Sequence, residues 1–77
     1  MNKSRREELQ RAMDLAEQAK EIVEQARDEE QEYFDNMPEN MQGGDKGSAA
    51  ENAVGELEEA INSIDQAISS IDSAVSS

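Results

Sequence analysis

A repeat of seven residues in the second half of the chain decides the fold. It reads Ala53-Val54-Gly55-Glu56-Leu57-Glu58-Glu59, then Ala60-Ile61-Asn62-Ser63-Ile64-Asp65-Gln66, then Ala67-Ile68-Ser69-Ser70-Ile71-Asp72-Ser73, and ends in Ala74-Val75. Large aliphatic side chains recur in alternating steps of three and four at Val54, Leu57, Ile61, Ile64, Ile68, Ile71 and Val75, which we call the aliphatic ridge. This spacing predicts a coiled-coil helix over residues 48–76.

A second long helix is predicted upstream, over residues 4–36. Apolar side chains recur there at helical spacing at Leu9, Ala12, Met13, Ala16, Ala19, Val23, Ala26 and Tyr33, and the stripe is widened by Leu15, Ile22 and Phe34. Ser4 followed by Glu7 has the spacing of a capping box, which would begin the helix. Pro38 disfavours helical geometry at Met37, so the helix should end near Asn36.

Residues 37–47 are predicted to form a loop, because they contain one proline and three glycines. The glycines permit positive φ angles and hence a reversal of chain direction. Ser48 followed by Glu51 has the spacing of a second capping box and would begin the second helix.

The whole chain, residues 1–77, is therefore predicted to be one all-α domain, a two-helix antiparallel hairpin. A chain this short seldom obtains more than about 3–5 kcal/mol of stability from its own core. It has no cysteine for a disulfide, so oligomerisation is the remaining way to stabilise it. Isoleucine on both lines of a coiled-coil seam favours assemblies of more than two helices. We therefore expect two hairpins to form a four-helix bundle, or a larger helical oligomer, with the aliphatic ridge as the interface.

The charge of the chain narrows the choice of partners. Nineteen acidic against seven basic residues give a net charge of −12. Such a charge repels nucleic acid and anionic membranes, so the expected partners are other copies of the chain and a basic host protein. No apolar run is long enough for a signal peptide or a membrane span, which favours the cytosol.

The composition lacks most of the side chains that enzymes use for catalysis. The absence of histidine and cysteine removes the commonest metal ligand, the usual general base and any thiol nucleophile. There is no glycine-rich phosphate loop either. We expect no enzyme activity, no cofactor and no metal site.

Acidic residues recur every three or four positions on one face of the first predicted helix. They are Asp14, Glu17, Glu21, Glu24, Asp28, Glu32 and Asp35, which we call the acidic face. One interpretation is a mimic of DNA that occupies a basic groove. The other is an ordinary solvated surface, with Glu17–Lys20 and Glu24–Arg27 as ion pairs along the helix. Lys20 and Arg27 interrupt the charge, which favours the second interpretation.

The most distinctive segment surrounds the end of the first predicted helix. Its candidate binding residues are Tyr33, Phe34, Asn36, Met37, Pro38, Asn40 and Met41. The two aromatic rings would either cap the open end of the bundle under the loop or anchor a partner, since aromatics and methionines suit recognition surfaces. A pocket for a flat small molecule is a third interpretation, although the segment has no positive charge for a phosphate.

The stretch Asp28-Glu29-Glu30-Gln31-Glu32-Tyr33-Phe34-Asp35-Asn36-Met37-Pro38-Glu39-Asn40-Met41-Gln42, together with Ala50-x-x-Ala53-Val54-x-x-Leu57-Glu58-Glu59-Ala60-Ile61, resembles a group of small acidic proteins of bacteriophages and mobile elements. The resemblance covers residues 24–74. It implies a phage-type accessory protein that binds a host factor, including components of antiviral defence. Two alternatives stay open: an oligomeric sponge for a nucleotide-like signalling molecule, and an acidic DNA mimic or structural assembly module.

Overall fold

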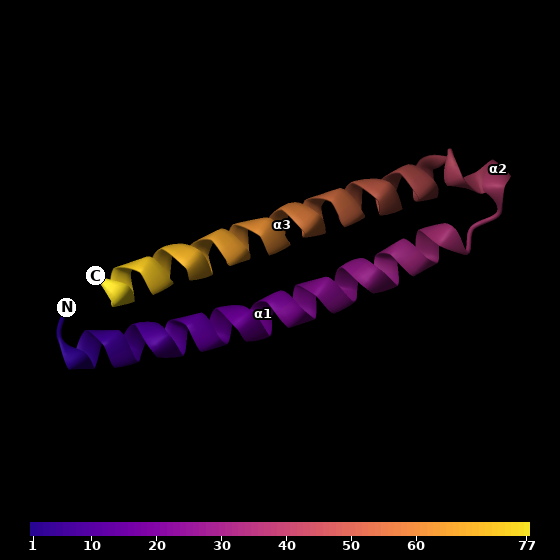
Figure 1. Ribbon diagram of the computed structural model, residues 1–77. Helices are drawn as coiled ribbons and strands as arrows, with labels where there is room; N and C mark the ends of the chain where they lie inside the picture. Colours follow the sequence, from indigo (N-terminus) through magenta and orange to yellow (C-terminus); the bar gives the residue numbers. More distant parts are fainter.

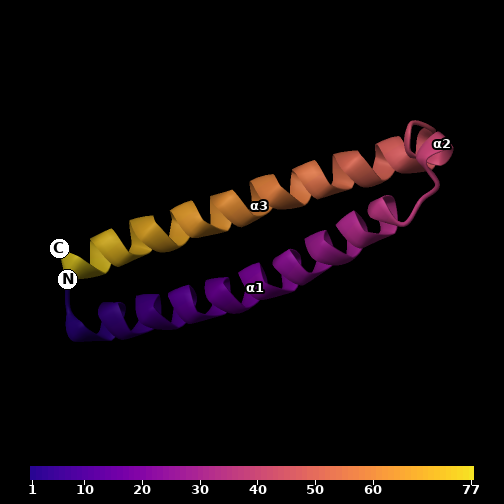
Figure 2. The same ribbon diagram turned by 45° about the vertical axis from the view of Figure 1, so that its right-hand side comes forward.

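The computed structural model describes all 77 residues and is entirely helical, without strands. Helix α1 spans Lys3–Asp35, the short helix α2 spans Glu39–Gln42, and helix α3 spans Asp45–Ser76. The two long helices lie side by side and run in opposite directions, with both termini at one end and α2 at the other (Figures 1 and 2). The molecule is a rod of 58 × 15 × 13 Å.

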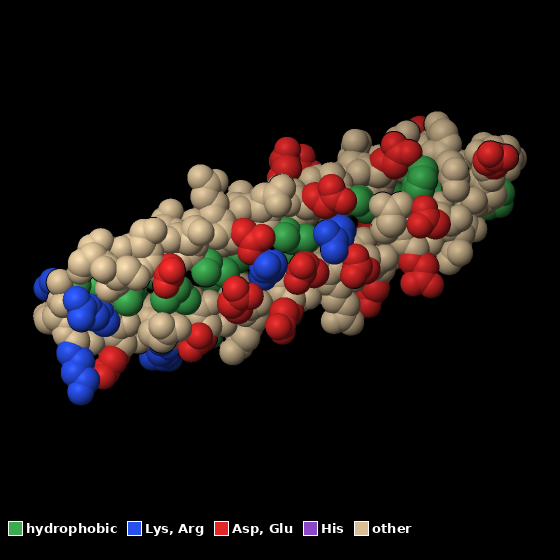
Figure 3. All heavy atoms as spheres, viewed as in Figure 1, with side chains coloured by type: hydrophobic (Ala, Val, Ile, Leu, Met, Phe, Trp, Pro, Cys, Tyr) green, Lys and Arg blue, Asp and Glu red, His purple; other side chains and the backbone are tan.

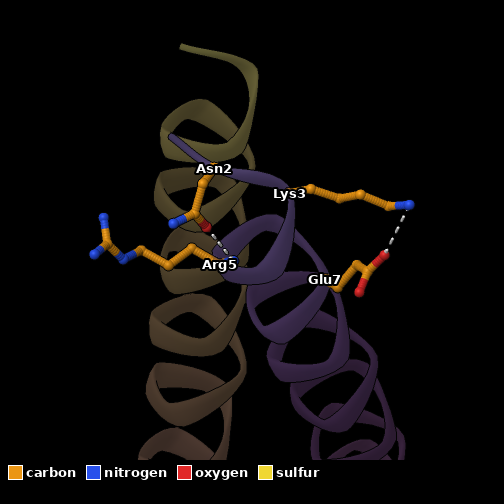
Figure 4. A network of polar contacts seen from close by, with 4 residues as sticks. All are labelled: Asn2, Lys3, Arg5 and Glu7. Carbon is orange, nitrogen blue, oxygen red and sulfur yellow. Dashed lines mark hydrogen bonds and ion pairs between the residues drawn. The ribbon is translucent and has the colours of Figure 1, made fainter.

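Helix α1 begins one residue earlier than expected, because a different residue caps it. The side-chain oxygen of Asn2 accepts a hydrogen bond of 2.8 Å from the backbone N–H of Arg5 (Figure 4). Ser4 lies inside the helix, so the expected capping box does not form. The Glu7 carboxylate instead lies 4.0 Å from the Lys3 ammonium. At the other end, Asn36 is the C-cap and its N–H donates to the Glu32 carbonyl.

The connection between the long helices is more ordered than the predicted loop. Pro38 is the N-cap of α2, and α3 then begins at Asp45, three residues before the expected Ser48. No glycine has a positive φ, so the reversal does not use the freedom for which the glycines were expected. One of them has a different role. A Cβ on Gly47 would collide with the carbonyl group of Gln42, so glycine allows α2 to pack directly on the first turn of α3.

The core is a single line of contact between α1 and α3. On α3, the aliphatic ridge faces α1: Val54 and Ile61 are buried and the other five ridge residues are half-buried. On α1, most of the buried or half-buried residues follow a regular line, the inner line, made of Leu9, Met13, Ala16, Lys20, Val23, Arg27, Glu30 and Phe34. Ala12 and Glu24, which flank this line, are also half-buried. No side chain is completely buried. Two helices alone therefore cover this core only in part.

Candidate functional site

The rod has one hollow. It lies at the end where α2 joins the long helices, which is the end labelled α2 in Figure 1. Its volume is about 330 Å³ and its lining is Tyr33, Asn36, Met37, Pro38, Met41 and Lys46. Five of these six belong to the segment that the sequence singled out for binding. The structure thus brings most of that segment together around one space.

Hydrogen bonds hold the hollow in shape. The end of α1 leaves backbone carbonyls without helical partners. The side-chain amide of Gln42 donates to the Phe34 carbonyl in the last turn of α1, at 3.2 Å, and to the Met37 carbonyl just beyond the helix, at 3.3 Å. The N–H groups of Met41 and Gln42 donate to the Pro38 carbonyl at 2.8 and 3.2 Å. These contacts tie α2 to the end of α1 and fix the positions of the lining methionines.

Two residues of the predicted binding segment lie elsewhere. Phe34 is half-buried on the inner line of α1, so its ring belongs to the contact between the helices. Asn40 is exposed on α2 and does not line the hollow. Only one of the two aromatic rings, that of Tyr33, is therefore presented to a ligand.

Lys46 is the lining residue that sequence reasoning missed. It was placed in a loop, whereas it lies in the first turn of α3. Nothing in the sequence around residue 46 predicts that α3 begins there, next to Tyr33 and Pro38. Lys46 gives the hollow a positive charge, yet Asp35, Glu39 and Asp45 adjoin lining residues along the chain. The site combines apolar side chains and adaptable methionines with one lysine, and acidic residues adjoin its lining residues in the sequence.

The acidic face is less interrupted than the sequence suggested. Lys20 and Arg27 turn toward α3, on the inner line, so they leave the outer surface to the acids. Lys20 Nζ lies 2.7 Å from Asp65 Oδ1 of α3, and Arg27 pairs with Asp28 at 3.0 Å. These replace the expected Glu17–Lys20 and Glu24–Arg27 pairs. The hydrogen bond to Asp65 raises the pKa of Lys20 above its usual 10.5.

Six of the seven acidic-face residues are exposed, and only Glu24 is half-buried. Figure 3 shows acidic side chains along the rod and basic side chains at the end where the chain begins, with further basic side chains near the middle. The surface is therefore acidic over most of its length and basic at one end.

A second apolar line on α1 is mostly exposed in the single chain. It consists of Ala12, Leu15, Ala19, Ile22, Ala26 and Tyr33, which we call the outer line. Leu15 is 55% exposed, Ile22 69% and Tyr33 49%. The spacing of the apolar residues by itself predicts one broad stripe that includes both lines. At about 100° per residue, the two lines lie roughly a quarter turn apart around the helix.

No group of three or more acidic residues is placed to hold a metal ion. None of the three helices has the length and apolar character needed to cross a membrane. No protein-family model matches the chain, and no curated protein or solved structure matches it either.

Proposed function

We propose that this chain is a non-catalytic binding protein that works as a homo-oligomer and takes an apolar anchor of a basic partner protein into the hollow between Tyr33 and Lys46. The observation that carries the proposal is a hollow with apolar lining residues in a strongly acidic chain. It is a concave site lined by Tyr33, Met37, Pro38 and Met41, in a chain of net charge −12.

The chemistry of the partner follows from this setting. A volume of about 330 Å³ fits one large side chain or a few small ones, which is the scale of an interface anchor. The acidic residues that adjoin the lining, Asp35, Glu39 and Asp45, attract basic residues on either side of that anchor and raise the association rate. Methionine side chains adapt to the shape of the inserted group. An apolar residue flanked by lysine or arginine is the expected target.

The working form is proposed to be a four-helix bundle of two chains, acting in the cytosol of a host cell. Five of the seven ridge residues are only half-buried by α1, which supports the addition of further helices. The resemblance to small acidic phage proteins supports a host factor as the partner, including a component of antiviral defence. Net charge disfavours nucleic acid and membranes as targets.

One observation favours a second candidate, an oligomeric sponge for a nucleotide-like molecule. Lys46 lies in the same hollow as the Tyr33 ring, so a flat anionic ligand has both a stacking surface and a counter-charge there. The neighbouring carboxylates oppose this binding, which is why we rank it second.

Affinity purification from a bacterial lysate tests the first candidate. The baits are the wild type, Met41→Glu, and Gln66→Glu as a matched control. Both variants add one negative charge at an exposed position, but only Met41 lines the hollow. We expect the wild type and the control to retain one basic protein that Met41→Glu loses. Equal retention by all three baits would contradict the hollow as the binding site.

The sponge is tested by thermal unfolding with ADP-ribose and with AMP. A ligand that binds only the folded state raises the melting temperature. A rise that Lys46→Ala abolishes would favour the sponge over the protein-binding function.

A further inference from the structure

We propose that the outer line of α1 is the surface on which a second copy docks, α1 against α1 and antiparallel, with Leu15 facing Ala26 of the second copy and Ile22 facing Ala19. This inference rests on the self-association in the proposed function and assigns its surface, orientation and register.

The first argument is the apolar surface that α1 leaves uncovered. Leu15 and Ile22 are more than half exposed and alternate with Ala19 and Ala26 in helical steps along one line, and Tyr33, 49% exposed, lies two steps beyond Ala26 on the same line. A helix with two apolar lines a quarter turn apart has the shape required at the corner of a four-helix bundle, where each helix contacts two neighbours. Helix α3 occupies one side of α1, and the outer line marks the other.

Helix α3 contributes to the same side of the rod. Each outer-line residue of α1 comes one position before an inner-line residue. In the same way, four alanines of α3 each come one position before a ridge residue: Ala53, Ala60, Ala67 and Ala74. Because the two helices run in opposite directions, residues one position before the contact line on each helix lie on the same side of the pair. The outer line and these alanines therefore form one apolar side, while most of the acidic face lies opposite.

The second argument is charge. Residues 1–13 contain four basic and two acidic side chains, whereas residues 28–59 contain one basic and eleven acidic ones. Along α1 this order opposes the helix dipole, since the first turn has no acid and the last turn has no base. An antiparallel copy sets each basic end beside an acidic end and offsets this cost. A parallel copy would place the two acidic ends together.

The third argument is size. In an antiparallel pair in which Leu15 faces Ala26, Leu15 and Ile22 each meet an alanine, and the helices overlap along almost their full length. Ala12 and Tyr33, at the two ends of the outer line, then meet Glu29 and Glu8. Arg11 of each copy then lies across from Glu32 of the other. A shift of seven residues one way sets Leu15 against Tyr33, so that two large side chains meet. The opposite shift still pairs Leu15 and Ile22 with alanines, but it separates Arg11 from Glu32 and leaves Tyr33 beyond the end of its partner helix.

Sedimentation equilibrium of three chains tests the surface: the wild type, Ile22→Glu, and Gln10→Glu as the matched control. Ile22 is exposed in the single chain, so its substitution should leave the helices intact, which circular dichroism checks. Gln10 is exposed on the same helix, away from the outer line. We expect the wild type and control at twice the chain mass of 8.5 kDa, and Ile22→Glu at 8.5 kDa.

Disulfide cross-linking tests orientation and register, because the chain has no cysteine of its own. Leu15→Cys and Ala26→Cys chains should cross-link when mixed and not when oxidised separately. In the proposed register, the two thiols that Leu15→Cys introduces into a dimer are about 16 Å apart along the axis, too far for a disulfide. Cross-linking of Leu15→Cys with itself would overturn the antiparallel arrangement.

Charge exchange gives an independent test of the register. Arg11→Glu and Glu32→Arg should each raise the dissociation constant of the dimer roughly 2- to 30-fold, because the symmetric dimer contains this surface pair twice. The double variant should restore the wild-type value. A wild-type dimer that Ile22→Glu leaves intact overturns this inference while self-association stands. A wild-type chain that sediments as a monomer overturns both, and neither result bears on the partner-binding hollow.

Discussion

The two long helices are nearly equal in length but use their apolar residues differently. Helix α3 spans 32 residues and places all its large aliphatic side chains on one ridge, none of which is among the exposed large hydrophobics. Helix α1 spans 33 residues and divides its apolar residues between two lines. Its inner line, which faces α3, includes Lys20, Arg27 and Glu30, while Leu15 and Ile22 face outward.

This difference separates two roles. The ridge of α3 accounts for the contact within the chain. Leu15 and Ile22 of the outer line are exposed and lie outside that contact, which is why we propose them as the surface for a second copy. The predictions below test this division of roles, from the largest expected effect to the smallest.

The largest effect should come from truncating a buried ridge residue. Ile61→Ala removes a buried side chain from a core with few others, and such changes cost about 2–5 kcal/mol. That is most of the stability expected for a chain of this size. The matched change Ile22→Ala affects an exposed side chain and should stay within about 0.5 kcal/mol when the chain is monomeric. Urea unfolding followed by circular dichroism measures both, and equal losses would contradict the division.

A pair of glycine substitutions separates the start of α3 from its interior. Gly47→Ala introduces a Cβ that collides with the Gln42 carbonyl, so it should destabilise the junction by about 1–3 kcal/mol. Gly55→Ala meets no atom within 4 Å and should stabilise the helix by about 0.5–1 kcal/mol. Thermal unfolding measures the two shifts. If both changes stabilise the chain, the packing of α2 on α3 is wrong.

The helices also differ in how they begin. Helix α1 has a side-chain cap from Asn2, whereas Gly44 caps α3 without one. Asn2→Ala should therefore cost about 0.5–2 kcal/mol, as for other N-cap residues. Ser4→Ala should have almost no effect, because Ser4 lies inside the helix. A larger loss for Ser4→Ala in the same unfolding experiment would restore the capping box predicted from the sequence.

The smallest effect concerns the one ion pair between α1 and α3. Folding raises the pKa of Lys20 through its hydrogen bond to Asp65. The pair therefore stabilises the fold fully below the unfolded lysine pKa of about 10.4, and this contribution declines as pH rises through the higher folded value. Lys20→Gln lacks the contribution. The difference in melting temperature between wild type and variant should shrink with rising pH, and a constant difference would contradict the pair.

Much of this arrangement could be read from the residues. The steps of three and four along the ridge require a helix, because only helical geometry sets those side chains on one side. Pro38 stops α1 close to the expected Asn36, since a proline disfavours the helical conformation of the residue before it. The segment from Tyr33 to Met41 was singled out by its aromatic and methionine content, and five of its residues line the hollow.

The remainder depended on one local competition and on how the helices pack together. Whether Ser4 or Asn2 caps α1 is a local competition that spacing alone does not resolve. Lys46 joins the hollow, and Gly47 is required, only because α2 folds back on α3. Lys20 left its expected partner Glu17 for Asp65 because α3 brings that carboxylate within 2.7 Å.

The sequence by itself determined two amphipathic helices, a break between them and an acidic surface, because periodicity and charge are properties of the chain alone. Only the tertiary structure decided which line of α1 faces α3 and which stays exposed. Two apolar lines a quarter turn apart on one helix are equivalent until another helix covers one of them, and the choice rests on side-chain fit across the contact.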